Sequence, residues 1–217
     1  MYLPPHFAET RRDVLQAAME ANPLATLVTQ SPRGVEADHL PMLVRGEGAS
    51  MVIAGHVARA NPVWKTHPQA AEVLAIFHGP QAYVSPSAYP AKADHGRVVP
   101  TWNYLVVHAR GRLRIVDEVA WKRALLEALT ARHEAGMPAP WQVGDAPADY
   151  VDTMINAVVG IEIDVVELVG KWKLSQNQTT ENRAGVANQL AARDDAESRE
   201  LAARMRVRDY FVDKRKP

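Results

Sequence analysis

Cysteine is absent from this chain of 217 residues. The absence excludes disulfide bonds, thiolate metal sites and a cysteine nucleophile, and it is typical of a reducing compartment. An excess of either charge is also absent, because 25 Lys and Arg residues balance 25 Asp and Glu residues. This balance gives no general attraction to nucleic acid, membranes or acidic substrates.

Long apolar runs are missing as well. No stretch of the sequence approaches the roughly 20 apolar residues of a membrane-spanning helix. Residues 1–7 lack the basic region and the apolar run of a signal peptide. We therefore expect a cytoplasmic protein without a membrane span.

Several catalytic and ligand-binding motifs are not found. The sequence has no GxGxxG fingerprint, no Walker P-loop and no GxSxG elbow, which argues against dinucleotide, nucleotide and hydrolase sites of those types. Its eight histidines are scattered, with no HxxxH or HExxH spacing. Asp94 and His95 could form a weak ligand pair, but a solvated loop explains them better. We therefore expect no metal site.

The pattern that is present alternates short strands with turns. The turn residues Ser31–Gly34 and Gly79–Pro80 separate some of the strands, and Gly111 inside a long strand indicates a bulge or a bend. Strands are expected over residues 24–29, 35–44, 51–54, 72–77, 81–85, 101–116 and 160–169. Helices are expected over residues 10–21, 61–66, 118–135 and 150–158, and from Glu181 onward. This pattern predicts a mainly β fold with α elements, a closed antiparallel barrel with peripheral helices.

Four segments carry side chains suited to ligand binding. In residues 55–65, Arg59 precedes a short helix with Asn61 as its expected N-cap, which suits a phosphate but also an ordinary surface charge and cap. In residues 79–86, Tyr83 and Ser85 share a strand face. Residues 99–104 place two aromatic side chains around an amide, which suits a flat heterocycle or a core cluster. Residues 171–177 are polar between a strand and a helix, which suits an anion or a cap.

Together these segments resemble the PaiB family of FMN-binding negative transcriptional regulators. The matching residues are 1–7, 56–64, 77–86, 99–104 and 173–177, in the family's order and spacing. The resemblance implies a split β-barrel fold similar to that of pyridoxamine-phosphate oxidases, with FMN in clefts between the two subunits of a homodimer. It implies a split-barrel domain over residues 1–178 and a helical C-terminal extension over residues 179–217. At Ala88 the sequence departs from the family pattern, which often has tryptophan there.

The same resemblance implies which residues bind the cofactor. Arg59 and Asn61 would face the FMN phosphate, helped by Lys65, and His56 would lie beside the ribityl chain. Tyr83 and Ser85 would line the pocket. The remaining candidates would line or close the cleft, some of them from the partner subunit: Trp102, Asn103, Tyr104, Lys173, Ser175, Gln176 and Asn177.

Three functions stay open at this point. The family name implies a transcriptional regulator, but direct DNA binding is doubtful: the sequence shows no helix-turn-helix, and nine Lys and Arg follow Gln178 against seven Asp and Glu. An FMN-dependent oxidoreductase is the second hypothesis, although no catalytic acid, base or substrate can be named. A module that binds flavin or haem without catalysis is the third, although no histidine has the context of an axial ligand.

Overall fold

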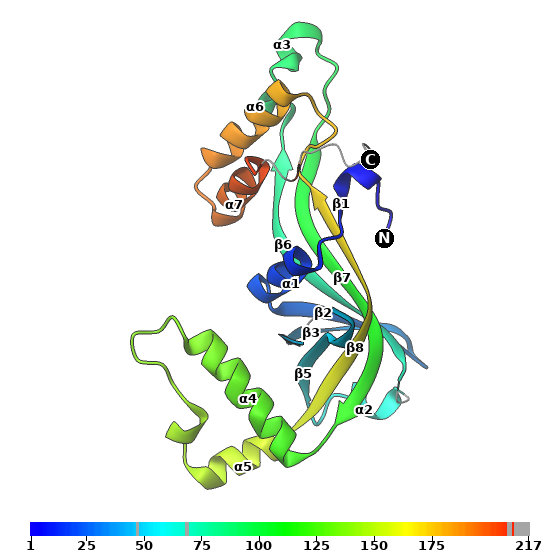
Figure 1. The fold of residues 1–217 in the computed structure, drawn as a ribbon, viewed down its shortest axis with the longest axis vertical. Coiled ribbons are helices and arrows are strands. Elements are labelled where there is room, and N and C mark those ends of the chain that lie inside the picture. The colour runs from blue at the N-terminus through cyan, green and yellow to red at the C-terminus, as the bar shows by residue number, and fades with distance from the viewer. Residues whose placement is uncertain (47, 68–69, 208–209, 211–217) are drawn as a thin grey trace. The chain divides into compact units, whose positions relative to one another are not determined.

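The computed structural model describes residues 1–46, 48–67, 70–207 and 210 (Figure 1). They form two compact units. The central unit contains residues 16–77 and 108–168. The terminal unit contains residues 1–15, 78–107 and 169–217, and so holds both ends of the chain. Three long strands, β6, β7 and β8, contribute residues to both units.

Eight strands form one antiparallel sheet within the described residues, in the order β3-β2-β6-β7-β8-β5-β4, with β1 paired to β8. The strands are β1 (Ala8–Glu9), β2 (Leu24–Ser31), β3 (Gly34–Pro41), β4 (Leu43–Arg45), β5 (Val52–Ala58), β6 (Glu72–Val84), β7 (Thr101–Val116) and β8 (Val158–Lys173). The helices are α1 (Arg12–Ala21), α2 (Val63–Thr66), α3 (Ala91–His95), α4 (Val119–Glu134), α5 (Ala148–Asn156), α6 (Thr180–Ala191) and α7 (Ala196–Met205).

The central unit holds the β2–β3 hairpin and the β5–β8 ladder. Strand β2 pairs with β3 from Leu24↔Pro41 to Ser31↔Gly34, and β5 pairs with β8 from Val52↔Asp164 to Ala58↔Val158. Alternate residues point inward, as the period-2 pattern requires. The inward side chains form an apolar core that includes Ala25, Leu27, Ile53, Val57, Val63, Ala75, Phe77, Ala109, Leu113, Ile161 and Ile163.

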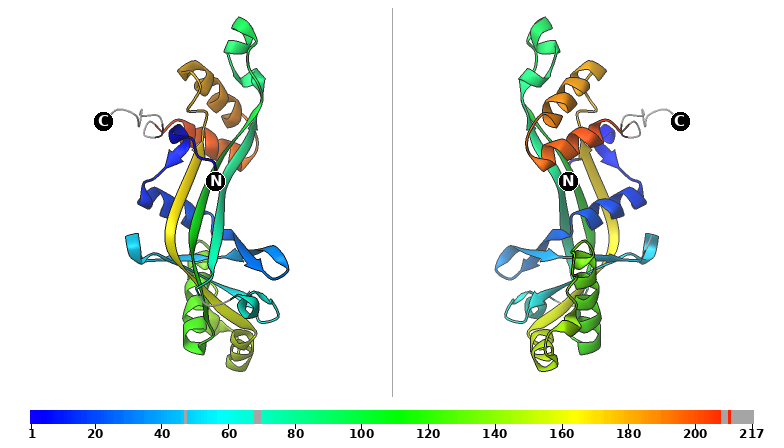
Figure 2. Two further views of the ribbon diagram at one scale, coloured as in Figure 1. Left: turned by 90° about the vertical axis from the view of Figure 1, so that its right-hand side faces the viewer. Right: turned by 90° about the vertical axis from the view of Figure 1, so that its left-hand side faces the viewer.

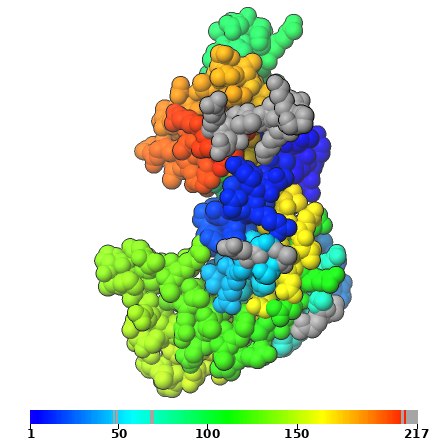
Figure 3. All heavy atoms as spheres, in the orientation of Figure 1, coloured from blue at the N-terminus to red at the C-terminus, as the bar shows by residue number. Residues whose placement is uncertain are grey.

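Helices α4 and α5 form an insertion between β7 and β8 of the central unit. Figure 3 shows the atoms of α4, the following loop and α5 as one continuous green surface. Leu125 and Leu129 of α4 are buried against Ala54 of β5, and Trp121 packs beside them. Gly160 of β8 makes room for the Trp121 ring, because a Cβ atom there would collide with it. The insertion is therefore packed on β5 and β8.

The terminal unit has its own core. Ala8 and Glu9 of β1 pair with Lys171 and Gly170 of β8. Helices α6 and α7 lie side by side (Figure 2), and the side chain of Asp195 caps α7 by accepting a hydrogen bond from the Ser198 amide at 2.7 Å. The core side chains of this unit include Phe7, Leu15, Val84, Leu105, Val107, Trp172, Leu174, Val186, Leu190, Leu201 and Met205.

The predicted mainly β fold with peripheral helices is confirmed, and so is a helical C-terminal segment up to Met205. The expected helix over residues 61–66 is a single turn, Val63–Thr66, and residues 211–217 lie outside the described part. The expected strand over residues 35–44 was wrong as one element, since β3 ends at Pro41 and β4 pairs with β5 instead.

The predicted break at Gly79–Pro80 was also wrong, because β6 runs unbroken from Glu72 to Val84. Its buried positions are Val73, Ala75 and Phe77 before Gly79, and Pro80, Ala82 and Val84 after it. The buried face therefore shifts by one residue at Gly79, where the missing Cβ lets Leu105 of β7 approach closely.

Gly111 of β7 is a point of close approach between two strands. A Cβ atom at Gly111 would collide with the main-chain oxygen of Asp164 and the side chain of Ile163 on β8. We expect Gly111→Ala to lower the free energy of unfolding by about 2 kcal/mol, the usual cost of overpacking. Urea unfolding followed by circular dichroism measures this change.

Gly136→Ala is the matched control, because nothing lies within 4 Å of a Cβ atom at that position. It should change the free energy of unfolding by less than about 0.5 kcal/mol. Equal stabilities of the two variants would contradict the close approach at Gly111.

Candidate functional site

The predicted site residues divide between the two units. His56, Arg59, Asn61 and Lys65 belong to the central unit, where they follow one another from β5 into α2. The other candidates belong to the terminal unit, at the ends of β6, β7 and β8: Tyr83, Ser85, Trp102, Asn103, Tyr104, Lys173, Ser175, Gln176 and Asn177. We call the first set the central group and the second set the terminal group.

Arg59 forms the centre of a polar network in the central unit. Its Nη1 and Nη2 donate to the two carboxylate oxygens of Asp117 at 3.0 and 2.6 Å. Its Nε donates to the Asn156 carbonyl at 2.6 Å, and Nη2 donates also to the Val158 carbonyl at 3.1 Å. The guanidinium thereby joins the end of β5 to both ends of the α4–α5 insertion. We call Arg59, Asp117, Lys122 and these two carbonyl groups the Arg59 network.

Lys122 is the buried member of the network. Its side chain is 1 % exposed, and Nζ donates to Asp117 Oδ1 at 2.8 Å and to the Val158 carbonyl at 3.2 Å. Hydrogen bonds from Arg59, and then from Lys122, hold the pKa of the Asp117 carboxyl down at about 2. One carboxylate therefore balances two cations, and the network carries one net positive charge.

Asn61 and Lys65 differ sharply in their surroundings. Asn61 Oδ1 accepts from the Val63 amide at 2.9 Å, so its side chain caps the start of α2 although Pro62, rather than the predicted Asn61, stands at the N-cap position, and Asn61 Nδ2 donates to Asp38 at 2.7 Å. Lys65 is exposed, with its Nζ 4.9 Å from the centroid of the Trp64 ring. Among the residues that the structure describes, no carboxylate forms an ion pair with Lys65, which leaves its ammonium available to an anion.

His56 lies on the face of β5 that α4 covers. It lines a pocket of about 310 Å³ together with Pro41, Leu126, Leu129, Thr130, His133, Glu134 and Trp141. Its Nδ1 is buried and has no hydrogen-bond partner within the described residues. Burial lowers the pKa of His56 below its usual 6.5, so the ring is mainly neutral at pH 7.

Two exposed aromatic side chains mark the terminal group. The rings of Tyr83 and Trp102 meet edge to face with centroids 6.0 Å apart, and they are 42 % and 48 % exposed. Trp102 Nε1 donates to Gln81 Oε1 at 3.0 Å, which fixes the indole. Such an exposed and oriented pair offers an apolar surface to a planar ligand.

Lys173 holds the start of β7 beside this pair. Its Nζ donates to Thr101 Oγ1 at 2.5 Å and to the Trp102 carbonyl at 2.8 Å. Burial, and then the charge of Lys171, lowers the pKa of Lys173. Lys171 in turn lies 5.5 Å from the centroid of the Tyr104 ring. The structure thus places Lys173 against the Trp102 main chain and Lys171 over the Tyr104 ring.

Asn103 and Ser175 form a buried pair deeper in the terminal unit. Asn103 Nδ2 donates to Ser175 Oγ at 3.0 Å, and both side chains are almost fully buried. Ser175 has φ +63°, a left-handed conformation that is rare outside glycine and asparagine. The pair fixes the turn after β8, which indicates a supporting position.

The remaining candidates form backbone turns or are exposed. Gln176 bridges two main-chain groups, accepting from the Leu174 amide at 2.7 Å and donating to the Trp172 carbonyl at 2.6 Å. Ser85 Oγ accepts from the Ser87 amide at 3.2 Å, and Asn177 is exposed. Nearby Ala88, where the family pattern often has tryptophan, is buried, and Gly185 of α6 closely approaches its main-chain oxygen.

The sequence analysis missed Asp117 and Lys122. A signal for them existed, because Lys122 lies on the same helix face as Leu125 and Leu129 in α4. A lysine at a core position requires a carboxylate partner, and two acidic residues, Asp117 and Glu118, stand directly before α4. The structure also has no cluster of three potential metal ligands and no helix long and apolar enough to span a membrane in the part of the chain that it describes.

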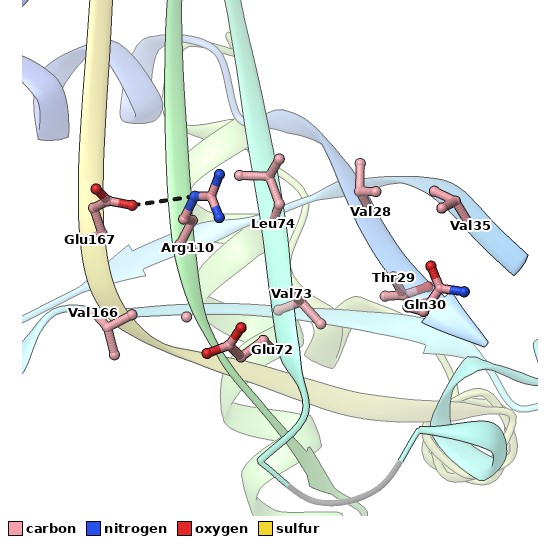
Figure 4. A pocket seen from close by; sticks show the side chains of 11 residues that line it. Val28, Thr29, Gln30, Val35, Glu72, Val73, Leu74, Arg110, Val166 and Glu167 are labelled. Atoms are coloured by element: carbon pink, nitrogen blue, oxygen red, sulfur yellow. Dashed lines mark ion pairs between the residues drawn. The ribbon is translucent and has the colours of Figure 1, made fainter. Parts of the chain in front are cut away.

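A second pocket lies on the sheet of the central unit (Figure 4). It has a volume of about 430 Å³, and its lining includes Val28, Leu74 and Val166 as apolar walls. Arg110 and Glu167 form an ion pair of 3.3 Å at its edge. None of the predicted cofactor-binding residues lies in this pocket.

Comparisons with known proteins agree with this architecture. Residues 1–167 match the family described as "Putative FMN-binding domain". The chain is 29 % identical over 207 residues to the Bacillus subtilis "Protease synthase and sporulation protein PAI 2", covering 94 % of this chain and 96 % of that one. It is 33 % identical over 222 residues to an uncharacterized protein of Emericella nidulans, covering 86 % and 88 %.

Solved structures share the fold at low sequence identity. The FAD- and haem-binding protein of Mycobacterium smegmatis has a TM-score of 0.56 at 16 % identity, covering 76 % of this chain and 73 % of that one. The flavocytochrome Anf3 of Azotobacter vinelandii has a TM-score of 0.56 at 16 % identity, covering 89 % and 75 %.

The long-stranded antiparallel sheet with its helices, shared with these proteins, defines a split-barrel fold, and the predicted fold class is confirmed. Within that class the chain belongs to the family of FMN-binding domains that matches residues 1–167. The resemblance to the PaiB family is confirmed by the same match and by the Bacillus subtilis relative.

The ion pairs of Asp117 make a testable contribution to acid stability. Its carboxyl has a pKa of about 2 in the fold and 3.8 when unpaired. Because the folded pKa is the lower one, the ionised carboxylate stabilises the fold above pH 3.8, and this contribution disappears as the pH falls toward 2. A shift of this size corresponds to roughly 2 kcal/mol. Solvent screening reduces it to about 1 kcal/mol, since Asp117 is 47 % exposed.

We therefore expect Asp117→Asn to unfold about 1 kcal/mol more easily than the wild type at pH 7. The two proteins should approach equal stability as the pH falls toward 2. Urea unfolding at several pH values measures this difference. A difference that does not change with pH would show that Asp117 acts by packing alone.

Proposed function

We propose that this chain binds FMN and that the segment from His56 to Lys65 holds the phosphate group. The observation that carries the proposal is the exposed ammonium of Lys65, which pairs with no carboxylate of the described residues and lies against the Trp64 ring, as the Arg59 guanidinium does, in a segment that the FMN-binding family match covers. A net positive charge at this end of β5 attracts a phosphate dianion. Bound FMN would supply redox chemistry, while the chain would bind and orient it.

Each residue of the central group has a distinct part in this proposal. Lys65 provides the mobile cation, and Arg59 provides the directional N–H groups that suit phosphate. Asn61 fixes the first turn of α2 through its cap. His56, neutral and with an unpartnered Nδ1, is available to a hydroxyl group of the ribityl chain.

The terminal group fits a flat ring system. The proposal gives contacts with the flavin rings to Tyr83, Trp102 and Tyr104, with Lys173 as a nearby hydrogen-bond donor. The exposed edge-to-face pair of Tyr83 and Trp102 supports it. Asn103, Ser175 and Gln176 would support these side chains from the turn behind them, and Ser85 and Asn177 would border them.

We also propose that the protein is a homodimer. The support is the sheet surface around the 430 Å³ pocket, where Val35 and Val166 are 72 % and 64 % exposed. Arg110 and Glu167 place charges of both signs on this surface (Figure 4), which suits the self-complementary surface of a two-fold symmetric interface. Apolar side chains at this level of exposure are the usual core of such an interface.

A regulatory role, in the cytoplasm, is proposed from the resemblance to the PaiB family of negative transcriptional regulators, and the Bacillus subtilis relative is described as a protease synthase and sporulation protein. The balanced charge of the chain favours action through the flavin or a protein partner over direct DNA binding. An FMN-dependent oxidoreductase remains the alternative function, and bleaching of the bound flavin by a reduced nicotinamide would favour it. A haem-binding module is the third possible function, and the appearance of a Soret band when haem is added would favour it.

The phosphate assignment predicts a difference between two flavins. FMN and riboflavin share the same rings, but only FMN has the phosphate. We expect Lys65→Ala to weaken FMN about fivefold and to leave riboflavin unchanged, because a charged hydrogen bond is lost. Titration followed by quenching of flavin fluorescence measures both dissociation constants.

Arg33→Ala removes an exposed cation elsewhere in the central unit and is the control, expected to change neither affinity. Lys65 is a cleaner probe than Arg59, since Arg59→Ala would also break the Arg59 network. An equal loss for both flavins would move the phosphate away from Lys65. If wild type retained neither flavin at tens of micromolar, the FMN proposal would be rejected.

The homodimer predicts a solution mass of twice the chain mass of 23.9 kDa. An obligate interface of about 2,000 Å² should persist at micromolar concentration. Val166→Asp should shift the mass toward the monomer, because it places a charge in the proposed interface, whereas Val99→Asp, at a site that is 74 % exposed, should not. Light scattering after size exclusion measures these masses, and a monomeric wild type would rule out the dimer.

A further inference from the structure

Arg59 is the residue best suited to phosphate, yet its hydrogen-bonding capacity is nearly used up. A guanidinium has five N–H groups. Four of them donate to Asp117, Asn156 and Val158. The Nη1–Nη2 edge faces the Asp117 carboxylate, and the Nε–Nη2 edge faces the two carbonyl groups. One Nη1 hydrogen is left outside these bonds.

The bond to Asp117 has the geometry that a phosphate would use. Arginine binds carboxylate and phosphate in the same way, through two parallel N–H···O bonds from one edge. Asp117 makes this pair of bonds at 2.6 and 3.0 Å. A phosphate can therefore make a two-point contact with Arg59 only by replacing the carboxylate or the carbonyl groups.

Of these two exchanges, loss of the carboxylate is the easier. The Arg59 and Asp117 side chains are 37 % and 47 % exposed, so water and an incoming anion can reach the bond. Asp117 would keep the Lys122 ammonium as its partner at 2.8 Å, so its charge would stay compensated. The Val158 carbonyl would likewise keep Lys122, at 3.2 Å, but the Asn156 carbonyl would lose the bond that it accepts from Arg59 Nε.

We propose that Asp117 competes with the phosphate group of the flavin for Arg59, and thereby sets how strongly the chain prefers a phosphorylated flavin. This inference rests on the proposed FMN function. Asp117 is a specificity-determining residue here, because its carboxylate occupies the edge of Arg59 that the phosphate would bind, and riboflavin has no phosphate to compete for that edge.

The competition also couples ligand binding to the α4–α5 insertion. Asp117 lies two residues before α4, while Asn156 and Val158 flank the end of α5. Arg59 is the side chain that joins all three. When phosphate binds the Nη1–Nη2 edge of Arg59, Asp117 before α4 loses its bonds to Arg59 and keeps its bond to Lys122. Binding of FMN, but not of riboflavin, should therefore loosen residues 117–127.

The test compares Asp117→Asn with Asp152→Asn. Asparagine keeps the size of Asp117 and an oxygen that accepts from Arg59 and Lys122, but it removes the negative charge. Asp152 pairs with Arg123 at 2.7 Å in the same insertion and does not touch Arg59, which makes it the matched control. Affinities for FMN and for riboflavin are measured by fluorescence titration on full-length protein.

We expect Asp117→Asn to tighten FMN about three- to tenfold, with riboflavin unchanged and Asp152→Asn like the wild type for both ligands. An unchanged ratio of FMN to riboflavin affinity in Asp117→Asn, or weaker FMN binding, would overturn the competition while leaving FMN binding itself intact. If the wild type bound neither FMN nor riboflavin, the inference would be overturned together with the proposed function.

Hydrogen exchange provides a second test that needs no variant, in case Asp117→Asn fails to fold. Wild-type protein is compared at matched saturation with FMN and with riboflavin. Faster exchange of residues 117–127 with FMN than with riboflavin supports the competition. Equal exchange with the two ligands contradicts it.

Discussion

The guanidinium of Arg59 joins three parts of the chain that are far apart in the sequence. It connects the end of β5 with residue 117 before α4 and with residues 156 and 158 at the end of α5. The insertion between β7 and β8, residues 117–157, is thereby tied at both ends to the strand that leads into the candidate phosphate segment. Lys122 completes the arrangement from inside, because a buried ammonium requires the same carboxylate. The position of the insertion and the electrostatics of the site thus depend on one charge cluster.

The two groups of candidate residues are built on different physical grounds. The central group consists of charges whose partners decide whether an anion can bind: Arg59 is engaged, Asn61 is a cap and Lys65 is exposed. In the terminal group, exposed aromatic rings are held by buried polar pairs such as Asn103 and Ser175. Phosphate recognition and ring recognition make these different demands on a binding site.

Sequence reasoning worked best where the chemistry is local. The long strand β7, the cap at Asn61 and the helix α4 follow from neighbouring residues, and the structure has each of them close to its predicted place. Motif spacing correctly gave the family. The predicted turn at Gly79–Pro80 was wrong, because these residues lie inside a continuous strand. The glycine is needed there for close packing against Leu105, which is a tertiary contact. Sequence reasoning also missed Asp117, whose importance depends on a partner 58 residues away.

The sequence by itself determined the class of the protein, the mainly β pattern and the list of candidate residues, since these depend on composition, periodicity and the order of motifs. Only the tertiary structure decided what those residues do. Arg59, Asn61 and Lys65 stand within seven positions of each other, and nothing local distinguishes the engaged cation from the exposed one. The difference arises because folding brings Asp117 and two carbonyl groups to Arg59 and brings no carboxylate of the described residues to Lys65. Hydrogen-bond partners are set by contacts between distant segments, which a linear pattern does not encode.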